Sequence, residues 1–200
     1  MKITENIIQQ SLAYESYRNL IESLFKEGKS TGITQSEELL HYSELNIHRM
    51  NRVEKTTVLN EDLKVELGKI KSPQIWLVLT EGWCGDAAQS IPVFNSIEKS
   101  FPNIQFRLVL RDENLDLMDQ FLTNGGRAVP KLLILDASNY ELLAHWGPRP
   151  QEATKLINEM KALNIEFAEI KEKLHLWYAK NRSQALQAEL LNIITKIVEN

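Results

Sequence analysis

The sequence predicts an α/β protein in which a mixed sheet of about four strands is flanked by helices, with extra helices at both ends. Gln74–Thr80 carries a continuous apolar run, typical of a strand buried on both faces. Lys131–Asp136 and residues 140–146 are two further apolar runs three residues apart, the spacing of an antiparallel hairpin. Eight glycines and six prolines in 200 residues are few, which favours helices over a loop-rich or all-β chain.

The N-terminal region, residues 1–72, is expected to be helical. A first helix shows apolar residues at the spacing of one helical face, and glycines in residues 26–34 end it. Thr34 and Glu37 form a capping-box pattern, so a second helix is expected from there to about Val53. The apolar positions of the first helix are Ile7, Tyr14, Ile21 and Phe25.

The second helix is expected to bury one face, and two polar residues, Asn46 and Arg49, fall inside that face. A third short helix is predicted after Asn60, a good N-cap residue followed by two acidic residues. The apolar positions of the second helix are Leu39, Tyr42, Met50 and Val53.

The middle of the chain alternates between strand and helix. The expected order is strand 74–80, helix 86–100, strand 105–111, helix 114–122, strand 131–136, strand 140–146 and helix 150–163. A right-handed crossover makes the first two strands parallel neighbours, whereas the last two form a hairpin, so the sheet is mixed. The rest, residues 164–200, is expected to be helical with a break near residues 181–183.

We therefore expect an N-terminal helical extension (1–72), a central α/β domain (73–163) and a C-terminal helical extension (164–200). The apolar stripe of the C-terminal helices must be buried, either on the protein's own core or in a homodimer, so monomer and dimer both stay open.

Composition and charge exclude several functions. The 23 Lys and Arg residues against 27 Asp and Glu residues leave a net charge of −4, which speaks against nucleic-acid binding. The apolar runs are far shorter than the ~18 residues of a membrane helix, and the first residues do not resemble a signal peptide. One cysteine excludes an intramolecular disulfide and a four-cysteine metal site, so no metal is expected. It fits the reducing cytoplasm, where we expect the protein.

Cys84 lies between the first central strand and the following helix. Open α/β sheets place their sites at this end of a strand, and a helix N-terminus favours a thiolate. Trp83 supplies a flat apolar wall, and Gly85 allows another chain to approach closely. The carboxylates of Glu81 and Asp86 oppose thiolate formation by like-charge repulsion. These residues alone leave the balance open.

The loop of residues 83–87, Trp-Cys-Gly-Asp-Ala, resembles the Trp-Cys-Gly-Pro-Cys active-site loop of thioredoxin. Pro92, eight residues after Cys84, matches the proline that kinks the thioredoxin active-site helix. Val129-Pro130, before a strand, matches the position of the cis-proline that faces the active cysteine. The resemblance covers residues 73–163 and implies a thioredoxin-like fold. With its added N-terminal helices and Cys-Gly-Asp sequence, the chain is similar to bacterial cytoplasmic thioredoxin-like proteins.

The sequence departs from thioredoxin at three positions. Ala87 replaces the second cysteine, Asp86 replaces the loop proline, and Val78 replaces the buried acid. The attacking cysteine is therefore retained, whereas the resolving cysteine is not. The candidate catalytic residues are Cys84, Trp83, Gly85, Asp86 and Pro130.

The resemblance implies a monothiol thiol–disulfide oxidoreductase in cell redox homeostasis, acting on a protein disulfide or thiol. Cys84 would attack the disulfide, and an external thiol such as glutathione would resolve the mixed disulfide. For such an enzyme we expect the pKa of Cys84 to lie below the ~8.5 of a free thiol. Two alternatives stay open: a non-catalytic protein-binding module in which Cys84 is not redox active, and a cluster shared between two chains with glutathione.

Arginines near the site suggest an anionic ligand, for example a glutathione carboxylate. Arg127 and Val129 are the candidate ligand-binding residues, and Arg111 and Arg49 are further candidates. The alternative is a structural salt bridge of these arginines, for example with Asp112 or Glu113.

Overall fold

The computed structural model describes residues 3–199. The strands are β1 (Gln74–Thr80), β2 (Ile104–Leu110), β3 (Lys131–Asp136) and β4 (Leu142–Trp146). The helices are α1 (Glu5–Gln10), α2 (Tyr14–Lys26), α3 (Glu37–Thr56), α4 (Glu61–Gly68), α5 (Gly85–Ser100), α6 (Leu115–Met118), α7 (Gln151–Ala162), α8 (Phe167–Asn181) and α9 (Gln184–Glu199), with a 3-10 turn at Arg111–Glu113.

The described residues form a four-stranded sheet of order β2-β1-β3-β4. β1 is parallel to β2 and antiparallel to β3, and β3 and β4 form the antiparallel hairpin. The predicted mixed sheet is therefore confirmed. Every residue of the central strand β1 is buried, as its continuous apolar run predicts.

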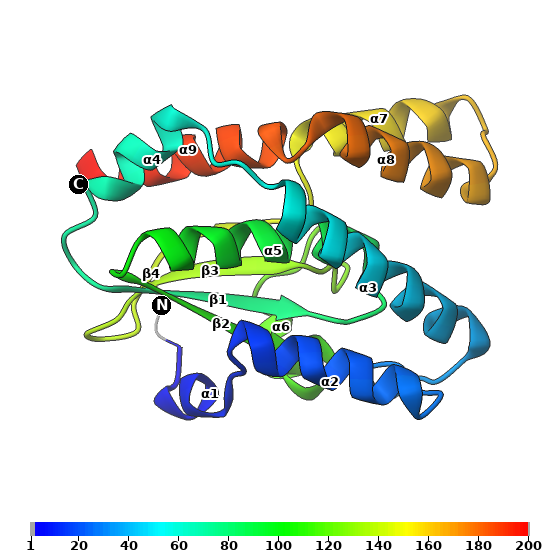
Figure 1. The fold of residues 1–200 in the computed structure, drawn as a ribbon, viewed down its shortest axis with the longest axis horizontal. Coiled ribbons are helices and arrows are strands. Elements are labelled where there is room, and N and C mark those ends of the chain that lie inside the picture. The colour runs from blue at the N-terminus through cyan, green and yellow to red at the C-terminus, as the bar shows by residue number, and fades with distance from the viewer. Residues whose placement is uncertain (1–2, 200) are drawn as a thin grey trace.

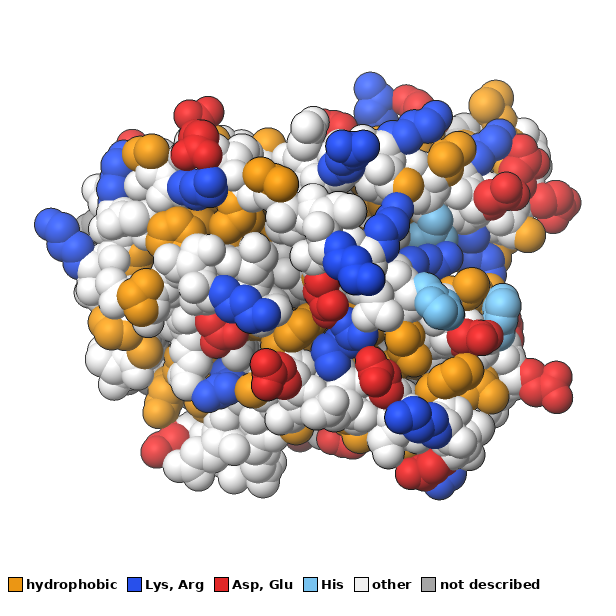
Figure 2. Space-filling model, viewed as in Figure 1, with side chains coloured by type: hydrophobic (Ala, Val, Ile, Leu, Met, Phe, Trp, Pro, Cys, Tyr) orange, Lys and Arg blue, Asp and Glu red, His pale blue; other side chains and the backbone are white. Residues whose placement is uncertain are grey.

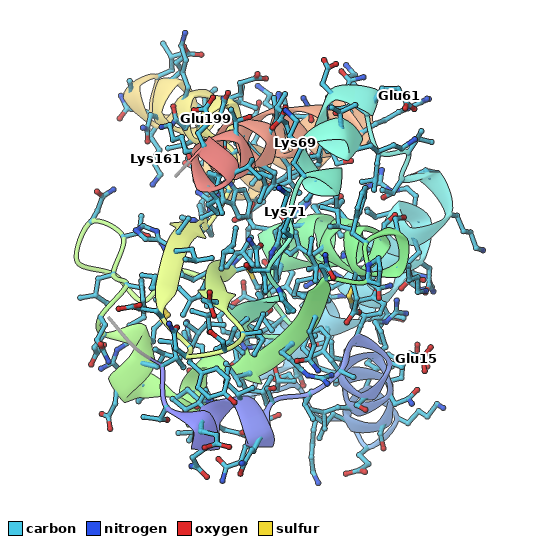
Figure 3. The ribbon with its side chains drawn as sticks, turned by 90° about the vertical axis from the view of Figure 1, so that its left-hand side faces the viewer. Glu15, Glu61, Lys69, Lys71, Lys161 and Glu199 are labelled. Atoms are coloured by element: carbon cyan, nitrogen blue, oxygen red, sulfur yellow. The ribbon has the colours of Figure 1, made fainter. Side chains whose placement is uncertain are left out.

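Helices cover the sheet on both sides (Figure 1). α5 lies above the sheet in this view, and α4, α9, α7 and α8 form the outermost layer on that side. α1, α2 and α6 lie below. The view from the side also shows the sheet between these helical layers (Figure 3). α4 and α9, which are far apart in the sequence, lie side by side: the Gln187 side chain donates to the Val58 carbonyl (3.1 Å) and accepts from the Asn60 N–H (2.8 Å).

The start of the chain differs from the single helix that its periodicity predicts. α1 and α2 are separate, because Leu12 pairs with Leu108 at the edge of the sheet through two backbone hydrogen bonds of 2.7 and 2.9 Å. The second helix expected from the sequence is α3, and it begins after Ser36, whose hydroxyl accepts a hydrogen bond from the Leu39 N–H at 3.2 Å. The predicted capping box that begins at Thr34 is therefore wrong. Residue 35 still belongs to the preceding loop, because its side-chain amide donates hydrogen bonds to the Ser30 and Gly32 carbonyls. The predicted cap at Asn60 is confirmed, with its side-chain oxygen 2.7 Å from the Leu63 N.

Two central elements are shorter than expected. The helix expected over residues 114–122 ends at Met118, after which the backbone tightens into turns such as Phe121 N–H to the Met118 carbonyl (2.9 Å). The last strand begins at Leu142, because Tyr140 has a φ of 58° and belongs to the hairpin turn. The break between the C-terminal helices is confirmed at Arg182 and Ser183, which both have positive φ.

One large hydrophobic cluster takes residues from all three expected regions. Tyr17, Met50 and Leu63 enter it from the N-terminal helices, and Leu186 and Leu190 enter it from α9. Burial on this core covers the inner face of α9. A second, smaller cluster lies between α7 and α8 and includes Ile157, Ile170 and Leu174. The boundaries at residues 72 and 163 stay predictions.

No helix within residues 3–199 has both the length and the apolar character to cross a membrane.

Candidate functional site

Cys84 lies at the carboxyl end of β1 and is the N-cap residue of α5. Its side chain is buried, with 8% of the residue exposed, and its thiol donates a hydrogen bond to the Val129 carbonyl at 3.1 Å. The Val129–Pro130 peptide bond is cis, and both residues are buried. The fold therefore brings the expected site residues Cys84, Val129 and Pro130 together.

The surroundings of Cys84 favour the protonated thiol. Burial raises the pKa of Cys84 to about 12, and the negative charge of Asp86 adds to this. The backbone N–H groups of Ala87 and Asp86 and the charge of Arg149 act in the opposite direction but are outweighed. The site therefore lacks the lowered thiol pKa that is expected of a monothiol oxidoreductase. The rise in pKa from desolvation, which the local sequence does not reveal, is larger than the lowering by the N–H groups of the helix N-terminus.

Asp86 is buried and connects three segments of the chain through hydrogen bonds to its carboxylate. Its carboxylate accepts hydrogen bonds from Arg149 Nε (2.8 Å) and Nη2 (2.5 Å), ahead of α7, and from the Tyr178 hydroxyl (2.7 Å) of α8. Only 6% of Asp86 is exposed. This candidate catalytic residue therefore joins the cysteine loop to the α7–α8 hairpin.

Helix α8 lies directly over the cysteine loop. A Cβ atom on Gly85 would stand 2.6 Å from Cε1 and 2.8 Å from Nε2 of His175, and 3.6 Å from Nη1 of Arg49. A Cβ atom at position 85 would therefore require the His175 imidazole to shift, so the segment that approaches Gly85 closely is this protein's own α8. The Nδ1 atom of His175 is buried without a hydrogen-bond partner among the described residues.

A cavity of about 440 Å³ opens between the cysteine loop, α3 and the α7–α8 hairpin. Lys and Arg side chains gather where α3 faces this hairpin, on the right of the space-filling view (Figure 2). The lining residues are Glu38, Leu39, Tyr42 and Arg49 from α3, Trp83, Cys84, Gly85 and Asp86 from the loop and α5, Arg149, Ile157 and Lys161 from the α7 segment, and Phe167, Ile170, Lys171, Leu174 and His175 from α8.

The expected arginines are placed differently. Arg127 is exposed and binds Asp119 through Nε (2.6 Å) and Nη2 (2.8 Å), and it does not line the cavity. Arg111 pairs with Asp112 and lies 4.9 Å from the centre of the Trp83 ring. Arg49 is the expected arginine that reaches the cavity.

Glu81 is buried but directed elsewhere. Its carboxylate accepts hydrogen bonds from the Thr31 hydroxyl (2.5 Å) and the Asp112 N–H (2.9 Å). Burial raises the pKa of Glu81, and these two hydrogen bonds act in the opposite direction but are outweighed. Glu81 thus holds the loop after β1 against Thr31 and Asp112. Asp86 is the acid whose charge raises the pKa of Cys84.

Sequence reasoning missed the contribution of α8. Lys171, Leu174, His175 and Tyr178 recur at intervals of three, one and three residues, so they share one helical face. That spacing can be read from the sequence. The sequence does not show that this face of α8 packs on the cysteine loop.

His175 is expected to make stability depend on pH. Burial lowers its pKa to about 4, and the charges of Arg49, Arg52 and Lys171 add to this. An unfolded histidine has a pKa of about 6.5, so the unfolded state binds more protons between these values and stability falls as pH drops from 6.5 to 4. We expect His175→Gln to reduce that loss by on the order of 1–3 kcal/mol.

The measurement is urea unfolding at pH 7 and pH 4.5. The matched control is His41→Gln, since the His41 side chain is 62% exposed and its replacement should leave the difference between the two pH values unchanged. An undiminished pH effect in His175→Gln would contradict the burial argument.

A metal site is not visible in the described part of the chain, in that no group of three or more His, Cys, Asp or Glu side chains is placed to hold an ion.

Comparisons with known proteins agree with this architecture. The family model described as thioredoxin matches residues 32–161. The crystal structure of an HIV epitope-scaffold is 21% identical, with a TM-score of 0.56 over 88% of this chain and 97% of the other. A protein of unknown function from Pseudomonas aeruginosa is 19% identical, with a TM-score of 0.57 over 92% of this chain and 98% of the other. At these identities the two structures show the fold alone. No curated protein matches the chain.

Proposed function

The chain belongs to the thioredoxin family, and from that premise we propose that it is a non-catalytic binding module in which the former redox site has become the floor of a ligand cavity. The observation that carries this proposal is the state of Cys84: its buried thiol donates to the Val129 carbonyl and lies beneath helices of the same chain. The lone cysteine also fits a reducing compartment, and we propose the cytoplasm as its location.

Three features argue against thiol–disulfide turnover. A thiolate is the attacking species, and the raised pKa of Cys84 leaves almost none at neutral pH. Ala87 supplies no second thiol to release a mixed disulfide. In addition, α8 lies over Gly85, where a substrate protein would have to approach.

The proposal predicts that Cys84 is unreactive in the folded protein. Iodoacetamide alkylation at pH 8 should be on the order of 10³ times slower in buffer than in urea, because a pKa of about 12 instead of ~8.5 removes most of the thiolate. Intact-mass spectrometry over time gives both rates on the same chain. A folded-state rate within tenfold of the unfolded rate would overturn the proposal.

A monothiol oxidoreductase is the second candidate, favoured by the fact that Cys84 lines the cavity. In that reaction, the Cys84 thiolate attacks oxidised glutathione, the old S–S bond breaks, and one glutathione leaves as a thiolate. A second external thiol then reduces the mixed disulfide. Incubation with oxidised glutathione separates the candidates: stoichiometric glutathionylation of Cys84 supports the oxidoreductase, and an unmodified mass supports the binding module.

A further inference from the structure

We propose that the cavity beside Cys84 binds a small organic monocarboxylate, whose carboxylate meets Arg49 and whose apolar body lies against the α7–α8 hairpin. This inference rests on the proposed function and names the class of ligand. A cavity of about 440 Å³ suits a small molecule.

Of the four cations that line the cavity, only Arg49 and the exposed Lys161 have no carboxylate within 4.0 Å among the described residues. Arg149 is neutralised by Asp86 at 2.5 Å, and Lys171 has Glu38 at 3.6 Å. Arg49 has no carboxylate within 4.0 Å among residues 3–199, and its one side-chain hydrogen bond runs from Nη1 to the Asn46 Oδ1 atom at 2.7 Å. A guanidinium has five N–H donors, so most of those of Arg49 remain available.

Burial makes this unpaired charge costly. Arg49 is half-buried, and desolvation lowers its pKa; the charge of Arg52 acts in the same direction and that of Asp86 in the opposite direction. A partly desolvated cation without a counterion is stabilised by any anion that reaches it. The charge pattern therefore favours a negatively charged occupant.

A second polar group converges on the same place. Arg49 Nη1 and the imidazole of His175 both lie close to the Cα of Gly85, since a Cβ atom there would stand 3.6 Å from Nη1 and 2.6 Å from Cε1 of the imidazole. The buried Nδ1 atom of His175 has no partner among the described residues. Both residues line the cavity, so an anion bound to Arg49 would lie close to the imidazole of His175.

The remaining wall is apolar and calls for an organic body. Leu39 and Tyr42 line the cavity from α3, and Phe167, Ile170 and Leu174 line it from α8. Phe167 is 64% exposed despite its size, so it forms an apolar rim that a ligand would cover.

A monocarboxylate fits this charge pattern better than a phosphate. The planar fork of one guanidinium matches one carboxylate. A phosphate dianion carries a second negative charge, for which the described part of the cavity wall offers only the exposed Lys161 as a further unpaired cation.

The test uses octanoate as the probe, with octanamide and octyl phosphate as analogues, in isothermal titration calorimetry on the full chain. We expect octanoate to bind, and octanamide and octyl phosphate to bind at least tenfold more weakly. Arg49→Gln should weaken octanoate binding at least tenfold. Arg127→Gln is the matched control, because Arg127 is paired with Asp119 outside the cavity, and it should leave the affinity unchanged.

A second readout follows the imidazole of His175 by NMR. A bound carboxylate near this ring should raise the pKa of His175 above its value of about 4, whereas a change in folding alone should not depend on octanoate. This keeps the proposal testable if Arg49→Gln fails to fold.

Absence of octanoate binding, equal binding of octanamide, or an unchanged affinity in Arg49→Gln would each overturn the proposed ligand class. Tighter binding of octyl phosphate would replace the carboxylate by a phosphate. The proposed function fails on a different result, rapid alkylation or glutathionylation of Cys84, so the two failures are distinguishable.

Discussion

Gly147→Ala is expected to lower the free energy of unfolding by about 3 kcal/mol or more. Gly147 follows β4 with a φ of +117°, where an L side chain is strained. A Cβ atom there would stand 2.2 Å from the Pro130 carbonyl oxygen, 3.2 Å from its carbon and 3.4 Å from the Lys131 Cα. All three are backbone atoms at the start of β3, so no side-chain rotation relieves the clash.

The matched control is Gly125→Ala. Gly125 has a φ of +75° but open space around the position of a Cβ atom, so only the backbone strain applies and about 1 kcal/mol is expected. Urea unfolding of both variants separates strain from steric clash. If the two variants lose equal stability, the close approach to Pro130 is not what requires glycine. Because Pro130 follows the carbonyl that accepts from Cys84, Gly147→Ala should also speed alkylation of the thiol.

Asp86→Ala is expected to cost about 2–4 kcal/mol, somewhat less than the ~3–5 kcal/mol for removing one partner of a fully buried ion pair, because the Arg149 side chain is 28% exposed. The variant leaves the Arg149 guanidinium and the Tyr178 hydroxyl without their shared acceptor. It also removes the negative charge that helps to raise the pKa of Cys84, and it detaches α8 from the loop. Alkylation of Cys84 at pH 8 should therefore become at least tenfold faster than in the wild type.

Asp119→Ala serves as the control for this experiment. Asp119 and Arg127 form a pair of similar geometry, but both side chains are more than 40% exposed, so its loss should leave stability and thiol reactivity nearly unchanged. Urea unfolding and mass spectrometry provide the two readouts. If Asp86→Ala behaves like Asp119→Ala, then Asp86 does not hold the α7–α8 hairpin on the cysteine loop.

The site was predictable in part. Local periodicity placed Cys84 at the junction of a strand and a helix, and the resemblance to thioredoxin put Val129–Pro130 opposite it. Arg127 was a reasonable candidate from its nearness to Pro130 along the chain. Its partner Asp119 lies eight residues away in the sequence, at the end of α6, and the sequence does not show that the two side chains meet.

The sequence by itself determined the strands, the hairpin, the break between the last two helices and the position of the cysteine, because each depends on residues a few places apart. Only the tertiary structure decided the state of the thiol. Its burial depends on α8, which reaches the loop from about ninety residues away through Tyr178 and Asp86. Desolvation is a sum over all neighbours in space, and neighbours so distant in the chain leave no local pattern.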